Sequence, residues 1–138
     1  MEIEPEGEEE ILERLMCKGK IHRARVTTAD LEYEGSISID TRLMRAADIW
    51  PFEMVQVTSL QNSIRWKTYA IPLEKEGEIG LNGPPARLFR PGDQVVILSL
   101  AMVEEEELKE LEPRVVLVDG DNRIVEVIRK NQMIKGWE

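Results

Sequence analysis

The chain has 138 residues, 42% of them hydrophobic, which suits one domain with one core. Its formal net charge of −9 at pH 7 disfavours a basic surface for phosphate backbones, so we expect no nucleic-acid partner. No apolar run approaches the roughly 20 residues of a membrane helix, and the acidic N-terminus does not resemble a signal peptide, so we expect a cytoplasmic protein with no membrane contact.

Residues 1–15 are predicted to be an acidic extension, followed by one domain over residues 16–138. Residues 8–15 show a helical pattern with three apolar residues on one face: Ile11, Leu12 and Leu15. We therefore expect this extension to be a packing helix or an oligomer contact.

The rest of the chain is predicted to be short strands joined by sharp turns. The predicted strands are residues 20–27, 36–40, 54–60, 64–73, 94–102, 114–118 and 123–128. Residues 36–40 alternate apolar and polar side chains, as a half-buried strand does. The apolar run at residues 95–98 indicates a strand that is buried on both faces.

Two short helices complete the prediction. Asp40 or Thr41 is a suitable N-cap for a helix that runs to residue 48. An acidic helix is predicted over residues 104–111 and is stopped by Pro113.

Asp-Gly-Asp-Asn at residues 119–122 is a hairpin signal between the last two predicted strands. A chain of this size with mostly strands commonly closes into a small barrel, because closure removes exposed strand edges. The sequence therefore predicts a mainly β fold: one small closed barrel with short helices.

The Gly35-Ser36 dipeptide is the candidate reactive site. A serine hydroxyl can attack the preceding carbonyl, so that the amide becomes an ester, and β-elimination then breaks that ester. Glycine favours such an attack because it reaches backbone angles that other residues avoid. A Gly-Ser pair alone is usually an ordinary turn, so its surroundings decide the interpretation.

Several separated motifs around this dipeptide keep their order and spacing. They are Gly19-Lys20-Ile21-His22-Arg23, Val26-Thr27, Ala29-Asp30-Leu31, Tyr33-Glu34-Gly35-Ser36, Ile39-Asp40, Thr68-Tyr69-Ala70-Ile71 with Arg65 before them, Leu81-Asn82-Gly83 and Gly92-Asp93. Together they resemble the aspartate 1-decarboxylase family over roughly residues 16–125.

This resemblance implies a double-psi β-barrel assembled as a homotetramer. It also implies self-cleavage into a β chain of residues 1–35 and an α chain of residues 36–138. Ser36 would become a covalent pyruvoyl group that forms an imine with L-aspartate, and neither a metal nor pyridoxal phosphate would be needed. The implied reaction converts L-aspartate to β-alanine and CO2 for pantothenate synthesis.

The resemblance assigns Tyr69 as the proton donor, and a tyrosine with a pKa near 10 is protonated at neutral pH. Aspartate carries two carboxylates, so the site needs fixed positive charge. Arg65 can bind a carboxylate through two parallel N–H hydrogen bonds, and Lys20 supplies a point charge.

On a regular strand Arg65, Lys67 and Tyr69 share one face and Thr68 points to the other. The resemblance nevertheless places Thr68 at the substrate or the cleavage site. Either the strand is irregular at this point or Thr68 acts through its backbone, and the sequence leaves both open.

His22 is the only histidine, two residues after Lys20. The resemblance places it in the site, where it assists processing or orients Tyr33. A metal site is not expected, since the chain has one histidine, one cysteine and no carboxylates at ligand spacing.

Asn82-Gly83 matches the family's turn beside the pyruvoyl group, where backbone groups contact the substrate. The family commonly continues with small alanines, whereas this chain continues with Pro84-Pro85. Proline has no N–H to donate, so those two residues can line the substrate site but give it no backbone hydrogen bond.

Two alternatives remain open on the sequence alone. One is a pyruvoyl decarboxylase for another acidic amino acid, because charge does not separate aspartate from glutamate. The other is a non-catalytic β-barrel interaction module that never cleaves at Gly35-Ser36.

Overall fold

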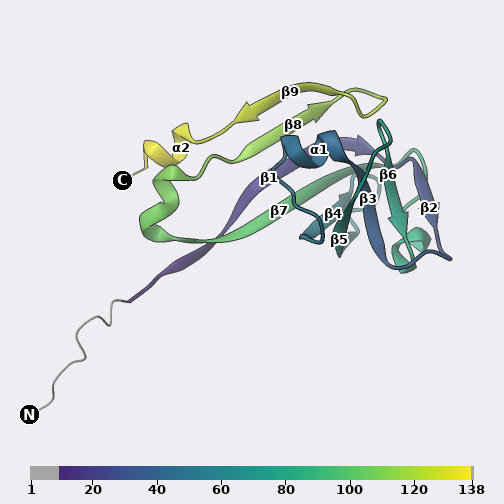
Figure 1. Ribbon diagram of the computed structural model, residues 1–138, viewed down its shortest axis with the longest axis horizontal. Coiled ribbons are helices and arrows are strands. Elements are labelled where there is room, and N and C mark those ends of the chain that lie inside the picture. Colours follow the sequence, from purple (N-terminus) through teal and green to yellow (C-terminus); the bar gives the residue numbers. More distant parts are fainter. Residues whose placement is uncertain (1–9, 138) are drawn as a thin grey trace, which may run out of the picture.

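The computed structural model describes residues 10–137, and strands dominate it (Figure 1). The strands are β1 (Glu13–Arg25), β2 (Thr28–Asp30), β3 (Ser36–Asp40), β4 (Met54–Ser59), β5 (Arg65–Leu73), β6 (Ile79–Asn82), β7 (Gln94–Glu104), β8 (Arg114–Val118) and β9 (Ile124–Arg129). The helices are α1 (Thr41–Ala46), the 3₁₀ helices η1 (Pro84–Arg87) and η2 (Glu105–Glu110), and α2 (Gln132–Lys135). The predicted class, one small and mainly β domain with short helices, is confirmed.

All nine strands of the described region belong to one sheet in the order β2-β6-β3-β5-β4-β7-β1-β8-β9. Strands β2 and β9 end this order and do not pair with each other, so hydrogen bonds do not close the expected barrel. The sheet is mixed, because β3 is parallel to β5 and antiparallel to β6. This arrangement puts β3, which begins at Ser36, between two strands that carry other candidate site residues.

The predicted bounds of β3 and β8 agree with the structure, and those of β4, β5, β7 and β9 lie within two residues of it. Strand β1 is longer than expected, because its first residues pair with β7 from Glu13↔Glu104 onward. The helix predicted over residues 8–15 is therefore wrong for residues 10–15: residues 10–12 are irregular and residues 13–15 are extended. Backbone pairing with β7 outweighs a weak helical pattern there, and residues 8 and 9 lie outside the described residues.

The apolar run of β7 was expected to be buried on both faces, and this is wrong. Val95 and Ile97 are fully buried, whereas Val96 and Leu98 are half-buried. β7 lies between β1 and β4, and only one of its faces covers the core. Figure 1 shows β1 and β7 running together away from the other strands, toward η2.

Asp40 is the last residue of β3 and the N-cap of α1. Of the two predicted caps, Asp40 and Thr41, the structure uses Asp40. Its carboxylate accepts hydrogen bonds from the backbone N–H groups of Arg42 and Gly77, each at 2.9 Å. Burial alone would raise the pKa of Asp40, but these hydrogen bonds and the Arg42 guanidinium together lower it below its ordinary value. The cap fixes the end of β3 opposite to Ser36.

Candidate active site

The Gly35-Ser36 junction lies where the turn after β2 enters the sheet. Ser36 is the first residue of β3, and only 1% of its surface is exposed. It pairs with Asn82, the last residue of β6, and the next residue, Ile37, pairs with Ala70 of β5. The junction is therefore held between two strands and is not a free surface turn.

The Ser36 hydroxyl has two polar neighbours. Asn82 Nδ2 donates a hydrogen bond to Ser36 Oγ at 3.0 Å, and Ser36 Oγ lies 3.4 Å from the carbonyl oxygen of Glu34. Asn82 Nδ2 also donates to Ser38 Oγ at 2.9 Å. The candidate nucleophile is thus oriented by an amide that comes from the turn predicted to lie beside it.

Gly83 and Pro84 pack against Gly35 at the junction. Gly83 has a φ of 78°, and a Cβ on it would lie 2.9 Å from Gly35 Cα. A Cβ on Gly35 would meet Pro84 Cδ at 3.9 Å. The Gly83 N–H donates to Asp30 O at 2.8 Å, so this donor is already used within the chain.

The residues after Gly83 form η1, which starts with the two prolines. Pro84 is exposed and Pro85 is buried. The Ala86 N–H donates to Gly83 O at 2.9 Å. The two prolines have no N–H group, and the N–H groups of Gly83 and Ala86 are already bonded within the chain. The donor that this turn directs at Ser36 is therefore the side-chain amide of Asn82.

Strand β5 is regular, which decides one of the two alternatives for Thr68. Its register with β4 runs without a bulge from Thr58↔Arg65 to Met54↔Tyr69. Thr68 is 6% exposed and lies on the core side with Ala70, while Arg65, Lys67 and Tyr69 alternate onto the other side. An irregular strand is therefore excluded at this position.

Tyr69 lies on the same side of the sheet as Ser36. Both residues directly precede the parallel pair Ile37↔Ala70, whose side chains are in the core, so both point away from the core. The Tyr69 ring is half-buried and stacks on Phe52, with ring centroids 5.7 Å apart. The sequence does not single out Phe52 as a site residue. It lies in the loop before β4, and the pairing of β4 with β5 brings it to Tyr69.

Arg65 and Lys20 are not neighbours of Ser36 in the sheet of one chain. Arg65 is exposed and lies four residues before Tyr69 on β5, which is roughly 13 Å along a strand. Lys20 is on β1, and the sheet order places β5, β4 and β7 between β1 and β3. No hydrogen bond or ion pair within residues 10–137 joins either side chain to the junction.

His22 is on the same strand as Lys20, at the pair His22↔Leu117 with β8. Its Nδ1 is buried and has no hydrogen-bond partner within the described part of the chain. Burial lowers the pKa of His22, and the positive charges of Lys20 and Arg23 lower it further. These effects favour the neutral imidazole over the charged form more than in an exposed histidine.

Tyr33 lies in the turn between β2 and β3, and 57% of its surface is exposed. Its backbone N–H lies 3.4 Å from Asp30 O, the same oxygen that accepts from Gly83. Among residues 10–137 no hydrogen bond joins the side chains of Tyr33 and His22, since His22 Nδ1 has no partner. The backbone of Tyr33, more than its phenol, shapes the turn that leads to Gly35-Ser36.

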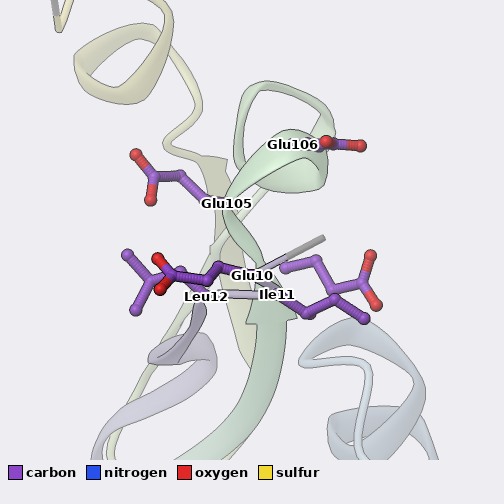
Figure 2. A pocket seen from close by; sticks show the side chains of 6 residues that line it. Glu10, Ile11, Leu12, Glu105 and Glu106 are labelled. Atoms are coloured by element: carbon purple, nitrogen blue, oxygen red, sulfur yellow. The ribbon is translucent and has the colours of Figure 1, made fainter. Parts of the chain in front are cut away.

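A pocket at the far end of the β1–β7 ribbon does not suit an acidic substrate. Figure 2 shows Glu10, Glu105 and Glu106 around it together with Ile11 and Leu12. Its carboxylates would repel an amino acid that carries two carboxylates. Within the described residues, no group of three His, Cys, Asp or Glu side chains is placed to hold a metal ion.

No helix in residues 10–137 is both long and apolar enough to span a bilayer.

These features define a small, mainly β protein whose candidate site is a buried backbone junction. Residues 12–125 match the model of the aspartate decarboxylase family, and the chain belongs to this family. It is 52% identical over 118 residues to the aspartate 1-decarboxylase of Hydrogenobaculum sp. (strain Y04AAS1), covering 86% of this chain and 94% of that protein. It is 50% identical over 113 residues to that of Syntrophobacter fumaroxidans, covering 81% and 91% of the two chains.

Proposed function

We propose that this chain is a self-processing, pyruvoyl-dependent decarboxylase that converts L-aspartate to β-alanine and CO2 for pantothenate and coenzyme A biosynthesis. The observation that carries the proposal is the Ser36 hydroxyl, which is buried and held by Asn82 Nδ2 at 3.0 Å directly after Gly35. Membership of the aspartate decarboxylase family supports the substrate and the reaction.

Self-processing begins when Ser36 Oγ bonds to the Gly35 carbonyl carbon and the C–N bond breaks, which moves the acyl group from nitrogen to oxygen. Removal of the Ser36 α proton then expels the Gly35 carboxylate and leaves a double bond in residue 36. Hydrolysis of that residue releases ammonia and leaves a ketone next to an amide. The products are residues 1–35 and residues 36–138, the latter starting with the pyruvoyl group.

The described residues around Ser36 fit this group. Asn82 offers an amide at the position of the former hydroxyl, Gly83 has no side chain at the junction, and the Pro84 ring leaves ordinary van der Waals distance to Gly35. The pyruvoyl group supplies a carbonyl that bonds to the substrate amine and accepts its electrons. The prolines donate no N–H group, so Asn82 takes a larger share of polar recognition in this chain.

Tyr69 is the proposed proton donor. It lies on the Ser36 side of the sheet, on the neighbouring strand β5, and its ring is held by stacking on Phe52. Its hydroxyl would deliver the proton that replaces CO2 on the substrate α carbon. Thr68 faces the core instead, so we propose that it acts through its backbone.

Arg65 and Lys20 are the proposed carboxylate-binding residues, and Gly83, Pro84 and Pro85 line the substrate. Since Arg65 and Lys20 are far from Ser36 along the sheet of one chain, we propose that another copy completes the site within a homotetramer. Phe52, which stacks on Tyr69, is 72% exposed and fits such a contact, as does Trp50 two residues earlier, which is 71% exposed. We place His22 and Tyr33 in supporting roles and the enzyme in the cytoplasm.

The intact mass of the purified chain under denaturing conditions tests the proposal. We expect two fragments that meet at Gly35/Ser36, the larger one lighter than a serine-started fragment by the mass of one ammonia. Ser36→Ala is the control and should give only the full-length mass. A wild-type chain that stays whole after prolonged warm incubation would favour the interaction module, and turnover of glutamate over aspartate would favour the other decarboxylase.

A further inference from the structure

Ser38 carries a hydroxyl next to the junction that the chemistry above does not use. It lies two residues after Ser36 on β3, so both side chains are on the same face. Ser38 Oγ accepts a hydrogen bond from Asn82 Nδ2 at 2.9 Å, across 44 residues of sequence. The contact is as short as the one that Asn82 makes with Ser36.

The two serines together use the whole donor capacity of the Asn82 amide. An amide nitrogen carries two hydrogens, and here one points to each hydroxyl oxygen. Ser36 Oγ lies 3.4 Å from the Glu34 carbonyl oxygen. A carbonyl oxygen is an acceptor, so the Ser36 hydroxyl directs its hydrogen toward Glu34. The lone pairs of Ser36 Oγ therefore face Asn82, which has to present an N–H rather than its oxygen.

The backbone fixes this geometry from both sides. Ser36 pairs with Asn82 and Ser38 pairs with Gly80 in the β3–β6 ladder. A Cβ on Gly80 would lie 2.6 Å from Thr28 Oγ1, so this position accepts no side chain. A side chain at Gly80 would also crowd Ser38, because the same Cβ would lie 3.6 Å from Ser38 Cβ.

We propose that Ser38 is a positioning residue for self-cleavage: it is the second acceptor that holds the Asn82 amide with its N–H toward Ser36 Oγ. The proposal rests on the proposed self-processing. An N–H donor stabilises negative charge on Oγ as the hydroxyl loses its proton, and again when the same oxygen leaves as part of the Gly35 carboxylate. Without Ser38 the amide can turn and present its oxygen to Ser36, which opposes both steps.

The test compares the self-cleavage rates of the full-length wild type, Ser38→Ala and Ser38→Thr, followed by intact mass at several pH values. We expect Ser38→Ala to cleave about tenfold more slowly, the usual size of one lost hydrogen bond to a charged oxygen. The self-cleavage rate of this variant should also rise only at a higher pH than that of the wild type, because the Ser36 hydroxyl loses a donor that favours its charged form. Ser38→Thr keeps a hydroxyl in a strand and should restore the rate and the pH profile.

Ser59→Ala is the matched control. Ser59, the last residue of β4, is a buried serine away from the junction with 1% of its surface exposed, and its hydroxyl accepts one hydrogen bond from the backbone N–H of Gln61. Ser59→Ala should cleave at the wild-type rate. Equal slowing of the two alanine variants, or a wild-type rate and pH profile in Ser38→Ala, would overturn the role of Ser38 and leave self-processing standing. A wild type that never cleaves would remove both proposals.

Discussion

Gly83 and Gly35 are in direct backbone contact: a Cβ on Gly83 would lie 2.9 Å from Gly35 Cα and 3.1 Å from Gly35 N. The turn after β6 therefore helps to set the position of Gly35, whose carbonyl Ser36 would attack in the proposed self-cleavage. Because real Cβ atoms do not approach another atom so closely, any side chain at position 83 has to move the junction.

Gly83→Ala is expected to slow self-cleavage by about 100-fold or more, because small misplacements of reacting atoms cost this much. Gly92→Ala is the matched control, since Gly92 also has a positive φ, 95°, but no atom within 4 Å of an added Cβ. Intact mass against time measures both variants. Similar cleavage rates in the two would show that backbone strain, rather than contact with Gly35, decides the effect.

Tyr69→Phe should be cleaved at the normal rate and lose about 100-fold or more in kcat for aspartate, the usual contribution of a general acid. The phenylalanine ring preserves the stacking on Phe52, so the fold is kept. Phe52→Leu is the companion variant, because it removes the stacking but keeps the hydroxyl, and we expect a smaller loss of kcat. Near wild-type turnover by Tyr69→Phe would remove Tyr69 as the proton donor.

Arg65→Ala should raise KM for aspartate by about 30-fold, which corresponds to losing hydrogen bonds to a charged carboxylate. Lys67→Ala is the control, since Lys67 is equally exposed on the same face of β5. Steady-state kinetics on the processed enzymes gives KM for each. If the Lys67 variant lost as much affinity as the Arg65 variant, general surface charge would explain the binding.

Asp40→Asn tests the pH dependence of stability. The folded-state pKa of Asp40 is lowered, so its contribution is present above the unfolded pKa of about 3.9 and is lost as pH falls through the folded pKa. Urea unfolding at pH 7 should show a variant about 2 kcal/mol less stable, because Asn cannot accept from both Gly77 and Arg42. Below pH 4 the two unfolding free energies should converge, and a constant difference would contradict this account.

Local patterns were enough to place β3 and the cap of α1. The alternation in residues 36–40 predicts the bounds of β3 correctly, but the expected half-burial is wrong, because Ser36 and Asp40 on its polar face are buried as well. Asp40 caps α1 because an N-cap needs only its own side chain and the next turn. Strand β6 was missed, because all four of its residues are buried and show no alternation. The extra length of β1 was missed for a related reason, since its first residues are a strand because they pair with β7, from Glu13↔Glu104 onward.

The sequence by itself determined the family, the junction at Gly35-Ser36 and the shared face of Arg65, Lys67 and Tyr69, because these depend on residue order and on the two-residue period of a strand. Tertiary structure alone decided that Asn82 reaches Ser36 and Ser38, that Gly83 touches Gly35 and that Phe52 holds Tyr69. These contacts join residues 17 to 48 positions apart through strand pairing and chain return. No local pattern encodes the register that creates them.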